Sequence, residues 1–299
     1  MIGPPRAPAP PAGEPGPPDR TAWLRAAWRA LRLLEHLLTG TLLTVAVAWR
    51  RPDGSYSYRP NIVRWWHQRA CRILRIVVEV TGTTPRESAL LVANHVSWLD
   101  VPVLGGLGPI AFLSKAEVRG WPLIGWLAAT AGTQFIARGS GEAGAVGERI
   151  GNHLVDHGCL ALFPEGTTTD GSIVKPFFPR LLAAASASGV PVVPVALRYE
   201  RGGALDPIAP FVGEESILSH LRRVLTARRF LVQVVFGKPL DPRAFDRRGL
   251  ATRARTTIVQ ALDHLAAAAR RQTLDREERS SRGTRARPPF APHDRLPLA

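Results

Sequence analysis

The sequence predicts an α/β fold in which a mixed, largely parallel sheet is flanked by helices and preceded by an N-terminal helical hairpin. From residue 89 onward, short apolar runs alternate with longer segments of helical periodicity, a pattern typical of sheets whose strands are joined by helices. Strands are expected at 89–93, 110–114, 133–136, 159–163, 191–197 and 230–236. Helices are expected at 98–105, 141–157, 179–188, 217–229 and about 243–270.

Two tryptophan-rich basic segments form the expected hairpin. In residues 23–49 apolar side chains and arginines interleave at helical spacing, and residues 62–80 repeat the pattern. The uncharged stretch 37–49 is shorter than the roughly 20 residues that a helix needs to cross a bilayer. We therefore expect both helices, joined by a turn at 51–60, to lie in the membrane interface and insert into one leaflet. The alternative interpretation is that both helices simply pack on the core.

The net charge of +15 indicates an anionic partner. Only three of the 39 basic residues are lysines, and the arginine fork suits phosphates and anionic headgroups. A nucleic-acid binder is the rival interpretation, yet no zinc-ligand spacing, helix-turn-helix signature or aromatic RNA-binding stripe accompanies the charge. Residues 1–80 alone carry twelve arginines against five acids, which favours a membrane surface and no nucleic acid.

The first catalytic candidates lie in residues 94–100, Asn-His-Val-Ser-Trp-Leu-Asp, directly after an expected strand. On one continuous helix His95 and Asp100 would lie about 140° apart. They can pair only if His95 lies in the loop and Asp100 in the first turns of the helix, at the carboxyl end of a strand where α/β enzymes place catalytic groups. A histidine so oriented can accept a hydroxyl proton near neutral pH. His and Asp at this spacing also occur by chance, so the pair alone is weak evidence.

A second constellation is the turn Phe-Pro-Glu-Gly-Thr-Thr-Thr at residues 163–169, again at the end of an apolar strand. Pro164 ends the strand and Gly166 permits a tight turn. Glu165 and three hydroxyls can then project at the same sheet edge as His95. A polar turn that caps the next helix explains these residues about as well when the motif stands alone.

Together these residues resemble the 1-acylglycerol-3-phosphate acyltransferase (lysophospholipid acyltransferase) family. Its first block, Asn-His-x4-Asp, matches 94–100, and its third, Phe-Pro-Glu-Gly-Thr, matches 163–167. Residues 132–138, Gly-Thr-Gln-Phe-Ile-Ala-Arg, correspond to the second block, and residues 190–195, Val-Pro-Val-Val-Pro-Val, to the fourth. Four blocks in the family's order are far more specific than either constellation alone.

The resemblance implies an O-acyltransferase that moves a fatty acyl group from an acyl thioester to a lysolipid hydroxyl in membrane lipid biosynthesis and phospholipid metabolism. The donor would be acyl carrier protein or coenzyme A, as a co-substrate, with no metal and no resident cofactor. His95 would be the general base held by Asp100. Substrate would be bound by Arg138, Glu165, Gly166, Thr167 and Thr168. Such an enzyme would lie on the cytoplasmic face of the inner (plasma) membrane.

The sequence departs from the family pattern at three positions. Ala137 stands where an aspartate is common, Thr168 where an arginine is common, and Phe178 where a basic residue is usual. Loss of an arginine removes a bidentate phosphate ligand. The variant is similar to the branch that acylates lyso-ornithine lipid, while lysophosphatidic acid stays open because Arg138, Lys175 and Arg180 could replace the missing charge. A non-catalytic lipid-binding protein with the same fold is the remaining alternative.

The chain is long enough for one sizeable core with appendages. Residues 1–20, with eight prolines, are expected to form a disordered leader, and residues 21–80 the membrane-associating helices. The acyltransferase catalytic domain is assigned to 81–270, and 271–299 to a disordered basic tail. Cys71 and Cys159, far apart in the sequence, predict inert thiols in a reducing compartment, without a disulfide.

Overall fold

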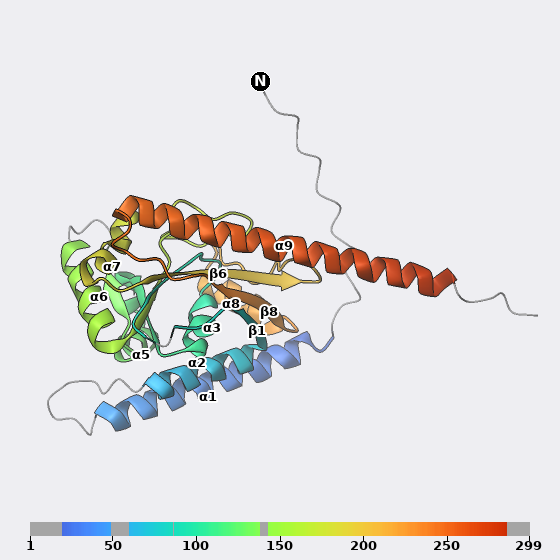
Figure 1. Cartoon of the computed structure of the whole chain (residues 1–299). Coiled ribbons are helices and arrows are strands. Elements are labelled where there is room, and N and C mark those ends of the chain that lie inside the picture. The colour runs from blue at the N-terminus through green and yellow to red at the C-terminus, as the bar shows by residue number, and fades with distance from the viewer. Residues whose placement is uncertain (1–19, 49–59, 86, 138–142, 286–299) are drawn as a thin grey trace, which may run out of the picture.

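The computed structural model describes residues 20–48, 60–85, 87–137 and 143–285. Most of the expected Pro-rich leader, the turn at 51–60 except its last residue, Arg138 and the last part of the expected tail therefore lie outside the described residues. The described residues form one eight-stranded sheet with helices on both faces (Figure 1). The α/β fold expected from the alternating pattern is confirmed.

The sheet has the order β1-β8-β6-β2-β5-β3-β4, and β7 pairs with β6. All neighbours are parallel except β6 with β8 and β6 with β7. The sheet is therefore mixed and largely parallel, as predicted. The strands are β1 (Ile76–Thr81), β2 (Leu90–Ala93), β3 (Ile110–Lys115), β4 (Gln134–Ile136), β5 (Cys159–Leu162), β6 (Val192–Arg201), β7 (Ala204–Leu205) and β8 (Phe230–Phe236).

The central strands β2 and β5 are buried along their whole length, because helices cover both faces of the sheet. One face packs against α2 (Pro60–Leu74), α3 (Asp100–Leu107) and α8 (Ile217–Thr226), with α1 (Ala22–Ala48) outside α2 and α8 (Figure 1). The other face packs against α6 (Ala143–His157), η1 (Pro179–Leu182), α7 (Ala183–Ser188) and α9 (Arg247–Arg285). Two short helices, α4 (Ala116–Arg119) and α5 (Ile124–Thr130), join β3 to β4.

The second helix of the hairpin is shorter than predicted, because residues 76–80 are not helical. Helix α2 ends at Leu74, Arg75 has a left-handed backbone (φ 59°), and β1 follows at the sheet edge. The segment Ile-Val-Val-Glu-Val-Thr is rich in β-branched residues, which favour a pleated strand. Pairing with β8, in the register Ile76 to Phe230, decides the conformation. The helical interpretation of 75–80 is therefore wrong.

The C-terminal helix is longer than predicted. A disordered tail was expected from residue 271, yet α9 continues to Arg285. Residues 271–285 contain no proline and many strong helix formers, and they extend a helix that is already nucleated. Ala269, close to the expected boundary, is buried, and Thr273 approaches the glycine turn between β6 and β7. The polar composition was mistaken for disorder, although the same residues are well suited to an exposed helix.

Helix α1 is fixed to the catalytic domain by two arginines. The Arg29 guanidinium, which is buried, donates to the carbonyls of Leu225 (3.1 Å), Ala227 (2.5 Å) and Arg228 (2.9 Å). Arg25 donates twice to the Thr226 carbonyl. These carbonyls end α8 and begin the link to β8, and cations suit the negative end of a helix dipole. The interpretation that the hairpin packs on the core is thus confirmed for this edge of α1.

The opposite face of α1 is apolar and exposed. Its large exposed side chains recur every three or four residues along the helix, and we call this set the apolar face of α1: Trp23, Leu24, Trp28, Leu31, Leu34, Leu38, Leu42 and Val45. Within the described part of the chain, no helix combines the length and apolarity that crossing a bilayer requires. Helix α1 therefore has one face for the protein and another for an apolar environment.

Close packing of α3 on α2 predicts that Gly105→Ala destabilises the protein. A Cβ at this position would lie 2.4 Å from the His67 ring, which is itself buried. We expect the free energy of unfolding to fall by about 1–3 kcal/mol in urea denaturation. Gly147→Ala on α6 is the matched control, since its Cβ would meet nothing within 4 Å. That variant should be unchanged or more stable by up to about 1 kcal/mol, and equal effects of the two changes would contradict the packing argument.

Candidate active site

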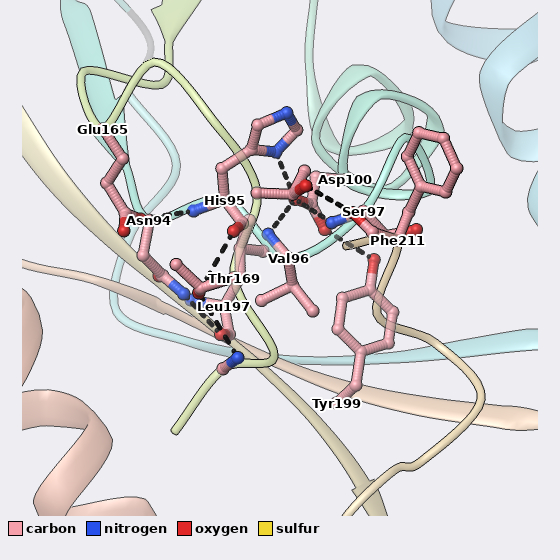
Figure 2. A network of polar contacts seen from close by, with 12 residues as sticks. Asn94, His95, Val96, Ser97, Asp100, Glu165, Thr169, Leu197, Tyr199 and Phe211 are labelled. Carbon is pink, nitrogen blue, oxygen red and sulfur yellow. Dashed lines mark hydrogen bonds and ion pairs between the residues drawn. The ribbon is translucent and has the colours of Figure 1, made fainter. Parts of the chain in front are cut away.

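Two loops leave the sheet side by side. Strands β2 and β5 are parallel neighbours, so the segment after Ala93 and the segment after Leu162 emerge at the same edge (Figure 2). The Thr169 amide donates to the His95 carbonyl at 2.9 Å and joins the loops directly. The expected meeting of the two motifs at one sheet edge is therefore present.

His95 and Asp100 meet where the chain leaves β2 and enters α3. His95 lies in the loop, Asp100 is the first residue of α3, and His95 Nδ1 lies 2.7 Å from Asp100 Oδ2. Because a carboxylate can only accept, the hydrogen lies on Nδ1 and the lone pair on Nε2. The His95 side chain is 20% exposed and that of Asp100 is fully buried. The imidazole therefore has one nitrogen held by the protein and the other available to a substrate.

Asp100 is held by four donors, of which His95 is one. The amides of Val96 (2.8 Å) and Ser97 (3.0 Å) donate to Oδ2, and the Tyr199 hydroxyl donates to Oδ1 at 2.9 Å. These donors replace the water that a buried carboxylate loses. The loop around Asp100 is thus folded so that one carboxylate oxygen faces His95 while the other faces Tyr199 (Figure 2).

Tyr199 is a member of this network that the sequence motifs did not reveal. It lies on β6 and is 2% exposed. Burial, followed by the charge of Asp100 and the hydrogen bond to it, raises the pKa of Tyr199 well above its ordinary value, so the phenol remains a donor. Alternate residues of β6 face the same side of the sheet as α3, and Tyr199 is the residue of this series that carries a hydroxyl. The two-residue period of the strand is the sequence signal that could have identified Tyr199.

Phe163 and Asn94 fix the position of the base. The Phe163 ring stacks on His95, with centroids 4.0 Å apart and an interplanar angle of 13°. Asn94 is buried and forms two hydrogen bonds with the Leu197 backbone, which tie the end of β2 to β6. Asn94 therefore holds the backbone next to His95, and Phe163 covers one face of the imidazole ring. Asn94 was part of the recognised block, but no role had been assigned to it.

Glu165 lies beside His95 and is turned inward. Its side chain is 3% exposed, Oε1 accepts from the His95 amide at 2.8 Å, and Oε2 accepts from the Lys175 amide at 2.7 Å. Burial raises the pKa of Glu165 above its ordinary value, and the two amide donors offset only part of this rise. In this structure the carboxylate braces the loop that carries His95. Substrate binding by Glu165 stays a prediction.

The remaining predicted substrate residues are placed differently from one another. Gly166 has a left-handed backbone (φ 67°), which glycine adopts without steric cost, and Thr167 is exposed. The Thr168 hydroxyl donates to the Phe211 carbonyl, and the Phe211 amide donates to the Val96 carbonyl at 3.0 Å. These two hydrogen bonds connect the third and first motifs to the segment before α8. Arg138 lies outside the described residues.

Comparisons with known proteins agree with this geometry. The family model described as Acyltransferase matches residues 75–198. The chain is 44% identical over 244 residues to the lyso-ornithine lipid O-acyltransferase of Pseudomonas aeruginosa, and the match covers 81% of this chain and 95% of that protein. The chain belongs to the acyltransferase family. The family match includes both the segment 94–100 and the segment 163–169.

Other relatives of the acyltransferase extend the comparison. It is 36% identical over 251 residues to the lyso-ornithine lipid O-acyltransferase of Rhodobacter capsulatus, covering 79% of this chain and 90% of that one. It is 30% identical over 170 residues to the 1-acyl-sn-glycerol-3-phosphate acyltransferase of Neisseria gonorrhoeae, covering 56% and 67%. The fold resembles the crystal structure of the 1-acyl-sn-glycerophosphate acyltransferase of Thermotoga maritima, with a TM-score of 0.63, 20% identity and coverage of 82% and 96%. The enzyme is a lysolipid acyltransferase of lipid biosynthesis.

Tyr199→Phe should slow acyl transfer while leaving the enzyme folded. The change removes one donor from a buried carboxylate, a loss of about 1.5–3 kcal/mol if fully expressed, so we expect kcat to fall by about 10- to 100-fold. Turnover of the acyl donor and urea denaturation are the measurements. A loss of stability with kcat unchanged would mean that Tyr199 serves packing alone.

Proposed function

We propose that this acyltransferase moves a fatty acyl group from an acyl thioester to the hydroxyl of lyso-ornithine lipid, with His95 as the general base. The observation that carries the chemistry is the His95 to Asp100 pair at 2.7 Å, in which Nδ1 is held and Nε2 is left for a hydroxyl. A base in this position can act as soon as both substrates are bound beside it.

The acyl group passes directly between substrates. His95 Nε2 takes the hydroxyl proton, the oxygen attacks the thioester carbonyl, and the tetrahedral intermediate expels the thiolate, which receives the proton from the imidazolium. Asp100 stabilises the imidazolium that forms. The thiols supply no nucleophile: burial raises the pKa of Cys71 to about 12 and raises that of Cys159, and both are buried. Among the described residues no hydroxyl is hydrogen-bonded to the His95 ring.

The acceptor is proposed from the third motif and from the relatives. Thr168 stands where an arginine is common in the family, and its hydroxyl is engaged by the Phe211 carbonyl. This position therefore lacks the bidentate phosphate ligand that an arginine provides. Lyso-ornithine lipid carries an amino-acid headgroup in place of phosphate. The relatives at 44% and 36% identity, which match most of this chain, bear the name of that activity.

The donor is proposed to be a thioester of acyl carrier protein or coenzyme A. Both are soluble and cytoplasmic, and the acceptor is a lipid, so we place the enzyme on the cytoplasmic face of the inner membrane. The apolar face of α1 supports this placement, because eight large apolar side chains exposed along one helix suit an interfacial position. In this arrangement the acceptor reaches His95 without leaving the bilayer surface.

His95→Ala should abolish most acyl transfer, because a general base contributes about 10² to 10⁴ in rate. Asp100→Asn should also reduce turnover strongly but less, since the base remains and only its orientation is lost. Release of free thiol from the acyl donor is the measurement. Both variants should keep the wild-type far-ultraviolet circular dichroism spectrum, and near-normal turnover of folded His95→Ala would refute the assignment of the base.

Acceptor choice can be measured by competition. Purified enzyme is offered lyso-ornithine lipid and lysophosphatidic acid together, with acyl carrier protein and coenzyme A thioesters tested in turn. We expect lyso-ornithine lipid to be acylated preferentially. Thr168→Arg, which restores the phosphate ligand, should raise the relative kcat/KM for lysophosphatidic acid by about 10-fold or more. Preference of the wild type for lysophosphatidic acid would overturn the proposed acceptor, and no turnover with any pair would favour a non-catalytic lipid-binding protein.

A further inference from the structure

A cleft of about 520 Å³ lined by seven arginines lies between α1, α2 and the start of β1. Arg25, Arg29 and Arg32 come from α1, and Arg69 and Arg72 from α2. Arg75 and Arg228 come from the residues just before β1 and β8. We call this set the arginine cleft. No carboxylate lines it among the residues that the structure describes.

The positive charge of the arginine cleft is only partly balanced. Glu35 pairs with Arg32 at 2.8 Å and with Arg69. Arg29 donates to carbonyls of the α8 end, which carry no net charge. Burial, followed by the charges of Arg25 and Arg75, lowers the pKa of Arg29 to about 10. Among the residues that the structure describes, the carboxylate of Glu35 is thus shared by two of the seven guanidinium groups.

Two of the arginines are available to a ligand. Arg72 and Arg75 are both exposed, and within the described part of the chain neither is paired with a carboxylate. Their side chains line the cleft together with Arg29 and Arg69, whose guanidinium groups already bind the end of α8 and Glu35. Guanidinium forks bind phosphate oxygens in pairs, so this arrangement suits a phosphate.

The backbone of Arg75 is strained. Its φ of 59° is left-handed, a conformation that glycine adopts freely and other residues do not. The turn from α2 into β1 would form with less strain if residue 75 were glycine. A strained backbone at a residue whose side chain lines a cleft supports a binding role for that side chain.

The surroundings of the arginine cleft indicate a lipid. Trp28 lines the cleft, is 62% exposed, and lies beneath the Arg32 guanidinium at 6.0 Å. It also belongs to the apolar face of α1. Tryptophan beside basic residues is typical of the level of lipid headgroups. The exposed apolar face of α1 continues from this tryptophan, which suits a lipid whose phosphate enters the cleft.

The arginine cleft and the dyad both lie toward the carboxyl end of β6, at different levels along the strands. Strand β1 starts beside the start of β8, which is antiparallel to β6, so the start of β1 is level with the end of β6 near Glu200. Strand β2 ends opposite Val195, and His95 follows in the direction of Glu200. In the order β1-β8-β6-β2 the two strands are three steps apart, about 14 Å across the sheet at the usual strand spacing, and the register separates the cleft from His95 further along the strands.

We propose that the arginine cleft binds the phosphate of an anionic phospholipid headgroup, and so holds α1, α2 and the start of β1 against the bilayer. The inference rests on the proposed membrane placement and is independent of the proposed base and acceptor. The bound lipid is a component of the membrane surface, not the acceptor of the acyl group.

Vesicle binding tests the proposal with the full-length protein. Vesicles of phosphatidylglycerol with phosphatidylcholine are compared with vesicles of phosphatidylcholine alone. For Arg72→Gln with Arg75→Gln we expect affinity for the anionic vesicles to fall by about 10-fold or more, since each basic residue near a membrane surface contributes substantially. Arg253→Gln with Arg271→Gln removes the same charge from exposed positions on α9, on the opposite side of the molecule (Figure 1). That control should stay within about twofold of the wild type.

A single change at the strained position separates binding from folding. Arg75→Gly should raise the melting temperature, because it relieves the left-handed backbone, and should weaken anionic vesicle binding in the same protein. A residue with only a structural role would not move the two measurements in opposite directions. His95→Ala should bind vesicles as the wild type does, so failure of the catalytic proposal and failure of this one give different results.

Three outcomes would overturn the proposal. Equal losses in the cleft variant and the α9 control would mean diffuse attraction by net charge, and no loss in the cleft variant would mean that the cleft is not used. Coenzyme A, added at constant ionic strength, supplies soluble phosphates. If it displaces the wild type from vesicles and binds the cleft variant less tightly, the cleft takes the phosphate of a soluble acyl carrier and the lipid assignment is wrong.

Discussion

The buried carboxylate of Asp100 sets the shape of the loop that carries His95. A carboxylate removed from water is stable only with donors around it, and here the donors are the Val96 and Ser97 amides, the Tyr199 hydroxyl and His95 Nδ1. Each donor comes at a fixed place in the chain, so the loop from Ala93 to α3 has one conformation that satisfies all of them. The orientation of the imidazole is a consequence of solvating one buried anion.

The parallel sheet provides the second constraint. Strand β2 lies between β5 and β6, and the end of each contributes to the site: His95 after β2, Glu165 after β5 and Tyr199 on β6. Glu165 receives the His95 amide and the Lys175 amide, while Asn94 bonds the Leu197 backbone. The loop that carries His95 is therefore tied to both sides of β2. Rigid strands position this loop, and hydrogen bonds hold it where the strands end.

The helical hairpin has a part in both the protein and its surroundings. Arg25 and Arg29 bind the carbonyl end of α8, so the same basic residues that suggested a membrane surface also hold α1 to the domain. The apolar face of α1 is exposed. Packing on the core accounts for one edge of the helix, and the proposed interfacial position would engage the other face.

Local sequence patterns are sufficient to predict the α/β class, the six main strands, the two motifs and their meeting at one sheet edge. These features depend on local periodicity and on strand ends, which are visible in the order of residues. Three others are seen only in the folded chain: residues 76–81 pair as a strand, α9 continues through residue 285, and Glu165 faces backbone amides. Tyr199 likewise meets Asp100 across 99 residues. Strand pairing and the solvation of buried charge depend on partners distant in sequence, which no local pattern specifies.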